Sequence, residues 1–173
     1  MGSTLTVDNI VGATTAANVK LPAGCIVQTQ SNKSATAYTN TTTSFSDVSG
    51  ATLNFTPKFA TSILRITFNC HANVYTSGAN NNAGGMLKLV HDGTDLDYNS
   101  SGNYAMYYQN DATDGTGPNN FYRHVLVAEV AASNTNARVI KAQARIYQSP
   151  TTAIRINQGG FYTSYFIVEE ISQ

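Results

Sequence analysis

Histidines and cysteines are the residues from which a metal centre is most readily built. His71, His91 and His124 stand far apart in the chain, and neither Cys25 nor Cys70 has a partner at zinc-ligand spacing. A tetrahedral zinc site usually takes its ligands from closely spaced pairs of such residues. The sequence therefore predicts ordinary polar histidines and no cofactor, with a metal site assembled from distant elements as the alternative.

A cluster of aspartates surrounds the segment HDGTDLD. Asp92, Asp95 and Asp97 lie within it, and Asp111 and Asp114 follow. An EF-hand loop needs a glutamate at its twelfth position and two flanking helices, a pattern that this segment does not meet. We expect Asp92 and Gly93 to form a two-residue hairpin turn with solvated carboxylates. Calcium held by these aspartates is the alternative.

The residue pairs needed for hydrolysis are missing from the sequence. Glu169 and Glu170 are adjacent, so on a strand their carboxylates would point to opposite faces. Neither a Gly-x-Ser-x-Gly nucleophile elbow nor a phosphate-binding glycine loop occurs. We predict that the protein is not an enzyme.

Tyrosines concentrate in a polar stretch from about residue 98 to residue 120. Tyr98, Tyr104, Tyr107 and Tyr108 stand there among Asn, Asp, Ser and Gly. Tyrosine offers a large flat contact with a polar tip, and long loops in compact domains are usually functional. We predict a recognition loop for a sugar or a neighbouring protein, with packing of the tyrosines on their own assembly as the alternative.

Composition narrows the possible partners. Only 12% of the 173 residues are charged and the formal net charge is zero. A basic stripe that could neutralise phosphates is therefore missing, which argues against nucleic-acid binding. The longest apolar runs are too short to cross a bilayer, so we expect no membrane insertion. The low charge is explained by coverage with partner subunits, by a surface of Thr, Ser, Asn and Gly, or by both.

The elements that would position these residues are strands. Apolar and polar residues alternate over residues 63–75, where Leu64, Ile66, Phe68 and Cys70 share one face. Such alternation is typical of an antiparallel sheet with one buried face. A disulfide between Cys25 and Cys70 is not required by anything in the sequence. Other candidate strands, bounded by turn residues, cover 25–30, 42–49, 51–58, 84–98, 121–132, 138–148, 152–158 and 163–172. We predict an all-β, antiparallel jelly-roll β-sandwich of about eight to ten strands.

Two strands are apolar on both faces. VLVAEV (125–130) and SYFIV (164–168) place large side chains at both parities, which suggests that a second subunit covers the outer face. Arg65, Lys141, Arg145 and Arg155 would form ion pairs across such an interface, or be solvated on a free surface. The candidate interface residues are Val125, Val127, Glu129, Tyr147, Tyr165 and Ile167.

A leading segment precedes the first clear strand. Residues 1–23 contain a strand-like start, a run of small residues and a Leu-Pro turn, so we separate this arm from a domain of residues 24–173. We expect the arm to order on docking and to anchor the protein, with a frayed terminus as the alternative. Its anchoring side chains would be Leu5, Val7, Ile10, Val11, Val19 and Leu21.

Three motifs carry a family resemblance. TLTVDNIVGATTAANVKLPAG (4–24), HDGT (91–94) and SYFIVEEI (164–171) resemble, in order and spacing, small virion proteins of marine and cyanobacterial phages. The resemblance implies a homotrimeric jelly roll similar to the tumour-necrosis-factor and complement globular-head domains. It implies a head-decoration, head-fibre or tail-fibre protein on the virion surface, assembled in the host cytoplasm. The alternative is a fibre tip that binds host glycans through the tyrosine-rich loop, which is longer here than the family pattern.

Overall fold

The chain folds almost entirely as β-strands. A computed structural model describes residues 22–75, 82–96, 106–109, 122–147, 153–158 and 162–173, and these contain no α-helix. The strands are β1 (Ile26–Ser34), β2 (Tyr38–Asn40), β3 (Ser46–Phe55), β4 (Ile63–Tyr75), β5 (Asn82–His91), β6 (Thr94–Asp95), β7 (Met106–Gln109), β8 (Tyr122–Ala131), β9 (Arg138–Ile146), β10 (Ala153–Ile156) and β11 (Ser164–Ile171).

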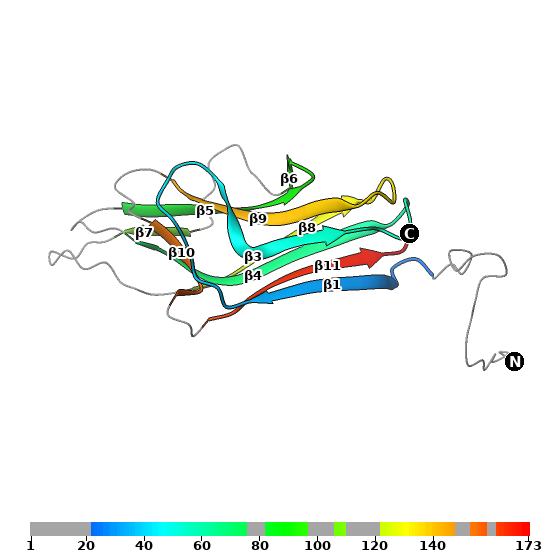
Figure 1. The fold of residues 1–173 in the computed structure, drawn as a ribbon, viewed down its shortest axis with the longest axis horizontal. Helices are drawn as coiled ribbons and strands as arrows, with labels where there is room; N and C mark the ends of the chain where they lie inside the picture. Colours follow the sequence, from blue (N-terminus) through cyan, green and yellow to red (C-terminus); the bar gives the residue numbers. More distant parts are fainter. Residues whose placement is uncertain (1–21, 76–81, 97–105, 110–121, 148–152, 159–161) are drawn as a thin grey trace, which may run out of the picture.

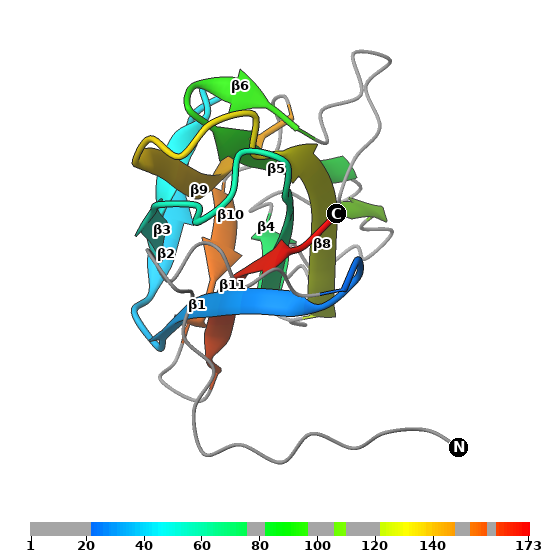
Figure 2. The ribbon, with the colours of Figure 1, turned by 90° about the vertical axis from the view of Figure 1, so that its right-hand side faces the viewer.

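Two antiparallel sheets face each other. Sheet A has six strands in the order β1-β11-β4-β10-β2, with β8 on the other side of β4. Sheet B has five strands in the order β3-β9-β5-β6, with β7 also paired to β5. Figure 1 shows the two layers from the side, and Figure 2 looks along the strands, where the curled sheets enclose the interior. The predicted all-β, jelly-roll β-sandwich is confirmed.

The core lies between the sheets because each strand turns its apolar parity inward. On β4, Leu64, Ile66 and Phe68 are fully buried, as the alternation predicted. The ring of Phe68 meets the ring of Phe166 edge to face, with centroids 5.9 Å apart. Truncating such an aromatic core residue to alanine typically costs about 3–5 kcal/mol.

Cys70 also lies on the inward face of β4 and is fully buried. Both cysteines are free, so no disulfide joins them. Burial raises the pKa of the Cys70 thiol to about 12. A thiol that stays protonated behaves as a small apolar core group.

The hairpin predicted at Asp92-Gly93 is present. His91 pairs with Thr94 across a two-residue turn, in which Asp92 and Gly93 have φ values of 47° and 81°. The left-handed region is open to glycine and tolerated by aspartate, so the chain can reverse here. The backbone N–H of Val139 donates to Asp92 Oδ1 at 3.0 Å and ties the turn to β9.

Several strands differ from the predicted ones in their bounds, and some were not predicted. The segments 42–49 and 51–58 form one strand, β3, which is continuous through Gly50 at a φ of 77° and has a register shift between Asp47 and Thr52. The two segments were predicted as separate strands, but Gly50 between them lies within β3, where the strand has a bulge. Strand β2 was missed, and β7 lies inside the segment predicted as a loop. Both are short strands held by backbone pairing to longer neighbours, which side-chain patterns do not report.

The end of the chain is joined to the point where the described residues begin. The N–H of Gly24 donates to the carbonyl of Ser172 at 2.8 Å, and the N–H of Ser172 donates to the carbonyl of Cys25 at 2.9 Å. These two bonds tie Gly24 and Cys25 to Ser172, which directly follows β11. The proposed anchoring side chains of the arm, from Leu5 to Leu21, lie outside the described residues.

Candidate functional site

The outer face of sheet A brings together five of the six candidate interface residues. Val125, Val127 and Glu129 alternate outward on β8, while Tyr165 and Ile167 alternate outward on β11. Strand β4 lies between them, so the register aligns Val125 with Asn69 and Asn69 with Tyr165. Of the candidate residues, only Tyr147 is elsewhere, because it follows β9 in sheet B and its N–H donates to the carbonyl of Gly84.

Apolar side chains on this face are exposed in the single chain. Val125 is 56% exposed, Val127 is 54% exposed and Tyr165 is 40% exposed. The inward residues of β8, by contrast, pack against the core cluster. Strand β8 is therefore apolar on both faces. Its inner face packs against the core of its own chain, and its outer face stays exposed.

Three charged residues of this face, Arg65, Glu129 and Glu169, are paired within the chain. Arg65 Nε lies 2.8 Å from Glu129 Oε1, and its NH1 lies 4.0 Å from Glu169 Oε2. Register explains the triad, since Arg65 is opposite Glu129 on one side and Glu169 on the other. Both Arg65 and Glu129 are solvent-exposed, so this pairing contributes little stability.

The other three basic residues considered as interface groups also have partners in their own chain. Lys141 Nζ lies 2.9 Å from Asp47 Oδ2, and Arg145 NH1 donates to the carbonyl of Thr43 at 3.0 Å. Arg155 stacks over the ring of Tyr75, 4.4 Å from its centroid. Each forms its contacts without a second subunit.

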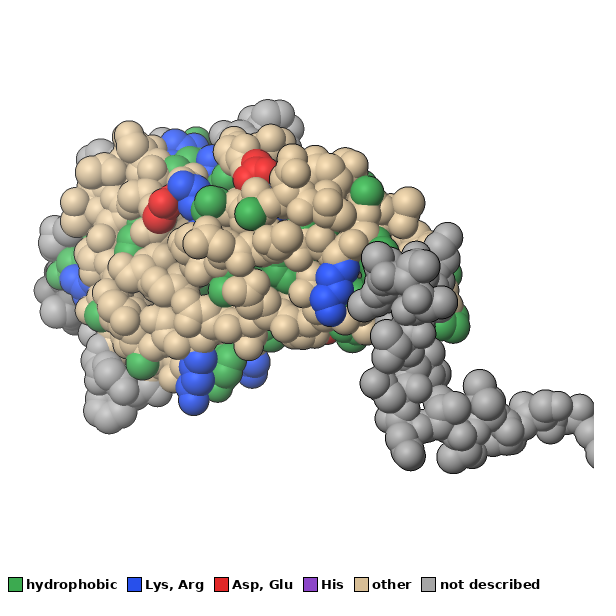
Figure 3. All heavy atoms as spheres, turned by 45° about the vertical axis from the view of Figure 1, so that its right-hand side comes forward, with side chains coloured by type: hydrophobic (Ala, Val, Ile, Leu, Met, Phe, Trp, Pro, Cys, Tyr) green, Lys and Arg blue, Asp and Glu red, His purple; other side chains and the backbone are tan. Residues whose placement is uncertain are grey.

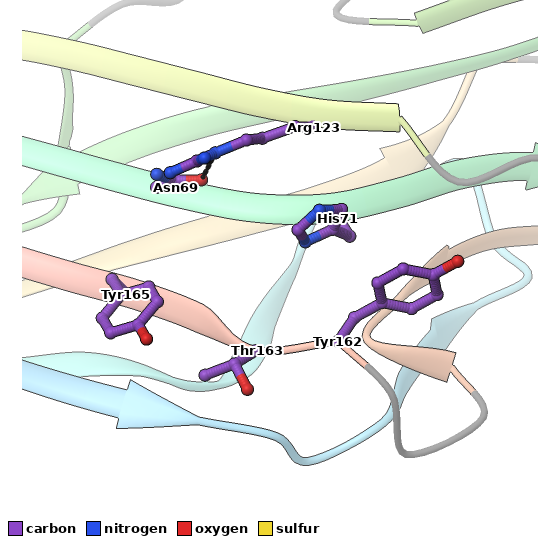
Figure 4. A pocket seen from close by; sticks show the side chains of 6 residues that line it. All are labelled: Asn69, His71, Arg123, Tyr162, Thr163 and Tyr165. Atoms are coloured by element: carbon purple, nitrogen blue, oxygen red, sulfur yellow. Dashed lines mark hydrogen bonds between the residues drawn. The ribbon is translucent and has the colours of Figure 1, made fainter.

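A hollow of about 370 Å³ opens at one end of this face. It lies where the middle of β4, the start of β8 and the start of β11 meet. Tyr162 and Tyr165 border it on two sides with Thr163 between them, as Figure 4 shows. The lining residues are Asn69, His71, Arg123, Tyr162, Thr163 and Tyr165.

Strand register assembles the polar side of the hollow. His71 is aligned with Arg123, so the guanidinium reaches along β4 and its Nε donates to Asn69 Oδ1 at 2.9 Å. The ring of His71 stacks on the ring of Tyr162 with centroids 4.8 Å apart. His71 Nδ1 is buried and has no hydrogen-bond partner in the described part of the chain.

The hollow is cationic. Among the described residues of its lining, Arg123 is the one of permanent charge, and Lys33 Nζ stands 5.8 Å from the centroid of the Tyr165 ring. No carboxylate occurs among these described lining residues, and Glu169 on the same face is turned to Arg65. Tyr165 was predicted at an interface, but the pattern of residues did not predict that these six residues meet, since this depends on register and on the chain entering β11.

The other two histidines, His91 and His124, are not part of the lining of the hollow. His124 Nε2 is buried without a hydrogen bond in the described residues, and burial, followed by the nearby His71, lowers the pKa of His124. His91 Nε2 lies 3.1 Å from Arg138 NH1, and burial, followed by this guanidinium, lowers the pKa of His91. Among the described residues, no group of three or more metal-ligating side chains converges.

Two of the clustered aspartates are engaged in local contacts. Asp95 forms an ion pair with Lys88 at 2.7 Å, and Asp92 accepts the bond from Val139. The remaining members considered for calcium, Asp97, Asp111 and Asp114, lie outside the described residues.

The two adjacent glutamates point to opposite faces, as predicted. Glu169 is on the outer face beside Arg65, whereas Glu170 is fully buried. Glu170 accepts hydrogen bonds from the N–H groups of Lys58 and Phe59 and, at 2.6 Å, from Gln28 Nε2. Burial alone would raise the pKa of Glu170, but these donors together hold it below its ordinary value.

Tyr98 and Tyr104 of the predicted recognition loop lie outside the described residues. The backbone of Tyr107 and Tyr108 belongs to β7, where it pairs with Gly84 and Ala83 of β5. Those two positions are therefore in a strand and not in a loop. Glycan recognition by these tyrosines stays a prediction.

The described residues contain no helix that is long and apolar enough to cross a membrane. No protein-family model matches the chain, and no curated protein is significantly similar to it. The resemblance to phage virion proteins therefore stays a prediction.

Proposed function

We propose that the protein is a non-enzymatic structural component that self-associates as a homotrimer through the outer face of sheet A. In keeping with the sequence resemblance, it would decorate a virion as a head fibre, head decoration or tail-fibre component. The arm of residues 1–23 would hold it on the particle by contact with capsid or tail proteins. In this proposal the protein acts by assembling, and burial of the outer face of sheet A between subunits provides the driving force.

The exposed valines of β8 are the observation that supports this proposal most directly. Val127 and Ile167 lie in one row across Thr67 and form the middle of the face. Large apolar groups that gather on one open sheet are typical of an interaction surface. Burying them in an assembly gains about 25 cal/mol for each Å² removed from water.

The general character of the surface agrees with a structural role. On the face seen in Figure 3, uncharged polar side chains and backbone predominate, and the charged groups are few and scattered. Such a surface lacks the strong single-sign field that steers charged ligands over long distances. Short-range packing would therefore have to decide which partner binds.

The mass of the full-length protein in solution tests the proposal. Light scattering at micromolar concentration should give three times the chain mass of 18.5 kDa. Val127→Arg places a charge in the middle of the face and should reduce the particle to a folded monomer, whereas Val139→Arg, at an exposed valine of sheet B, should leave it trimeric. A monomeric wild-type protein would contradict the proposal.

Location is tested separately. Labelling of intact particles should find the protein on the virion surface, and deletion of residues 2–22 should leave a trimer that no longer incorporates. Incorporation at the normal level without the arm would contradict the anchoring role.

A further inference from the structure

We propose that the hollow at the end of sheet A binds an acidic saccharide, with the sugar carboxylate on Arg123 and the sugar ring against Tyr165. This role is distinct from self-association, although Tyr165 belongs both to the hollow and to the candidate interface residues of sheet A. The hollow is built by a single chain, so a complete site exists in each subunit.

The charge of the hollow selects an anion. Arg123 uses its Nε to bond Asn69, and no other hydrogen bond of its guanidinium is found in the described chain. The Asn69 contact orients the guanidinium plane and leaves its terminal N–H groups for a ligand. A planar guanidinium with two parallel donors matches a carboxylate better than a neutral hydroxyl does.

The shape and chemistry of the remaining lining favour a sugar over a small inorganic ion. Tyr165 is 40% exposed, a large fraction for an aromatic ring, and offers a flat surface at the rim. An aromatic ring packs well on the C–H face of a pyranose, while its hydroxyl stays in water. Asn69 and Thr163 add an amide and a hydroxyl that can bond sugar hydroxyl groups. A volume of about 370 Å³ accommodates one to two sugar rings more readily than a lone anion.

The contacts within the hollow show that it is not packed for stability alone. His71 is held by the ring of Tyr162 but leaves its Nδ1 without a described partner. Buried polar groups in a well-packed interior are almost always satisfied. The hollow therefore combines an oriented cation and two aromatic rings, the groups that a polar ligand would contact, with one buried nitrogen, His71 Nδ1, that has no described partner.

Calorimetry with tetragalacturonate and its fully methyl-esterified form tests this proposal. The two probes share the sugar ring, but only the first has carboxylates. The wild-type protein should bind the acid at least tenfold more tightly than the ester at low salt, and the difference should shrink as salt screens the charge. Equal binding of both probes, or binding of neither, would overturn the proposal.

The affinities of variants distinguish binding at the hollow from binding elsewhere on the outer face of sheet A. Arg123→Gln should weaken acid binding about tenfold to a hundredfold, the usual loss for a charge-assisted hydrogen bond, with Arg123→Lys in between. Arg65→Gln is the matched control, since Arg65 is on the same face but outside the hollow, and it should bind as the wild type does. Tyr165→Ala should weaken binding of the acid, whereas Tyr165→Phe should preserve it. Unchanged affinity in Arg123→Gln, or an equal loss in Arg65→Gln, would refute the assignment.

A further variant makes failure of this site distinguishable from failure of self-association. Val127→Gln with Ile167→Gln changes the middle of the face without touching the lining or the net charge. If the variant becomes monomeric, it should still bind tetragalacturonate at the wild-type affinity. Loss of binding in a folded monomer would show that a single chain does not hold the complete site.

Discussion

Two polar clusters at opposite ends of β11 have opposite designs. At the C-terminal end, the Glu170 carboxylate is fully buried and accepts bonds from two backbone N–H groups and an amide. At the N-terminal end, Tyr165 faces an open hollow where His71 Nδ1 lacks a described partner. The cluster at Glu170 joins segments of the fold to one another, and the cluster at the hollow has groups that remain available to a ligand.

The difference teaches how to distinguish a structural polar cluster from a binding cluster. Glu170 ties β11 to Lys58 and Phe59 in the connection between β3 and β4, so its bonds join segments distant in the sequence. A charge is stable in the interior only when such donors replace water. Arg123 at the hollow is exposed, so water can satisfy those of its N–H groups that have no partner among the described residues.

The largest effect that tests this comparison is expected from Glu170→Ala. The change leaves two backbone N–H groups without their acceptor and creates a small void, so unfolding should become easier by roughly 3 kcal/mol. Glu169→Ala, one residue away on the outer face, should cost less than about 1 kcal/mol. Denaturant midpoints of the two variants measure the contrast, and similar losses would show that burial of Glu170 is not decisive.

Lowering the pH should also show that the Glu170 carboxylate stabilises the fold. The pKa of Glu170 is lowered in the folded protein below its ordinary value of 4.5, so the folded state binds this proton more weakly than the unfolded state does. The stabilisation is therefore complete above the unfolded pKa and is lost as pH falls through the folded pKa. Melting temperatures between neutral and strongly acidic pH should fall less steeply in Glu170→Gln than in the wild type. Parallel curves would contradict this assignment.

The smallest effect is expected at the hollow. Arg123→Gln and Tyr165→Phe remove groups whose contacts are exposed, so each should change the free energy of unfolding by no more than about 0.5 kcal/mol. Thermal melts of the ligand-free protein provide the measurement. A loss as large as that of Glu170→Ala would mean that the hollow is a structural cluster like the other.

Much of the fold could be predicted because alternation is a local signal. The parity of Leu64, Ile66 and Phe68 reveals which face of β4 is buried without knowledge of any neighbour. The turn at Asp92-Gly93 is likewise visible from two residues, since it depends on their own φ preferences. Short strands such as β2 and β7 were missed because three or four residues are too few to show an alternating pattern, and their backbone pairing with β10 and β5 is visible only in the structure.

The sequence by itself determined most of the longer strands and the inward face of β4, and it placed Val125, Val127 and Tyr165 on a face open to a partner. Only the tertiary structure decided that Asn69, Arg123 and Tyr165 meet at one hollow and that Tyr147 belongs to the other sheet. The physical reason is that side-chain alternation repeats every two residues within one segment. Register, in contrast, is set by backbone hydrogen bonds and packing between segments that are distant in the chain.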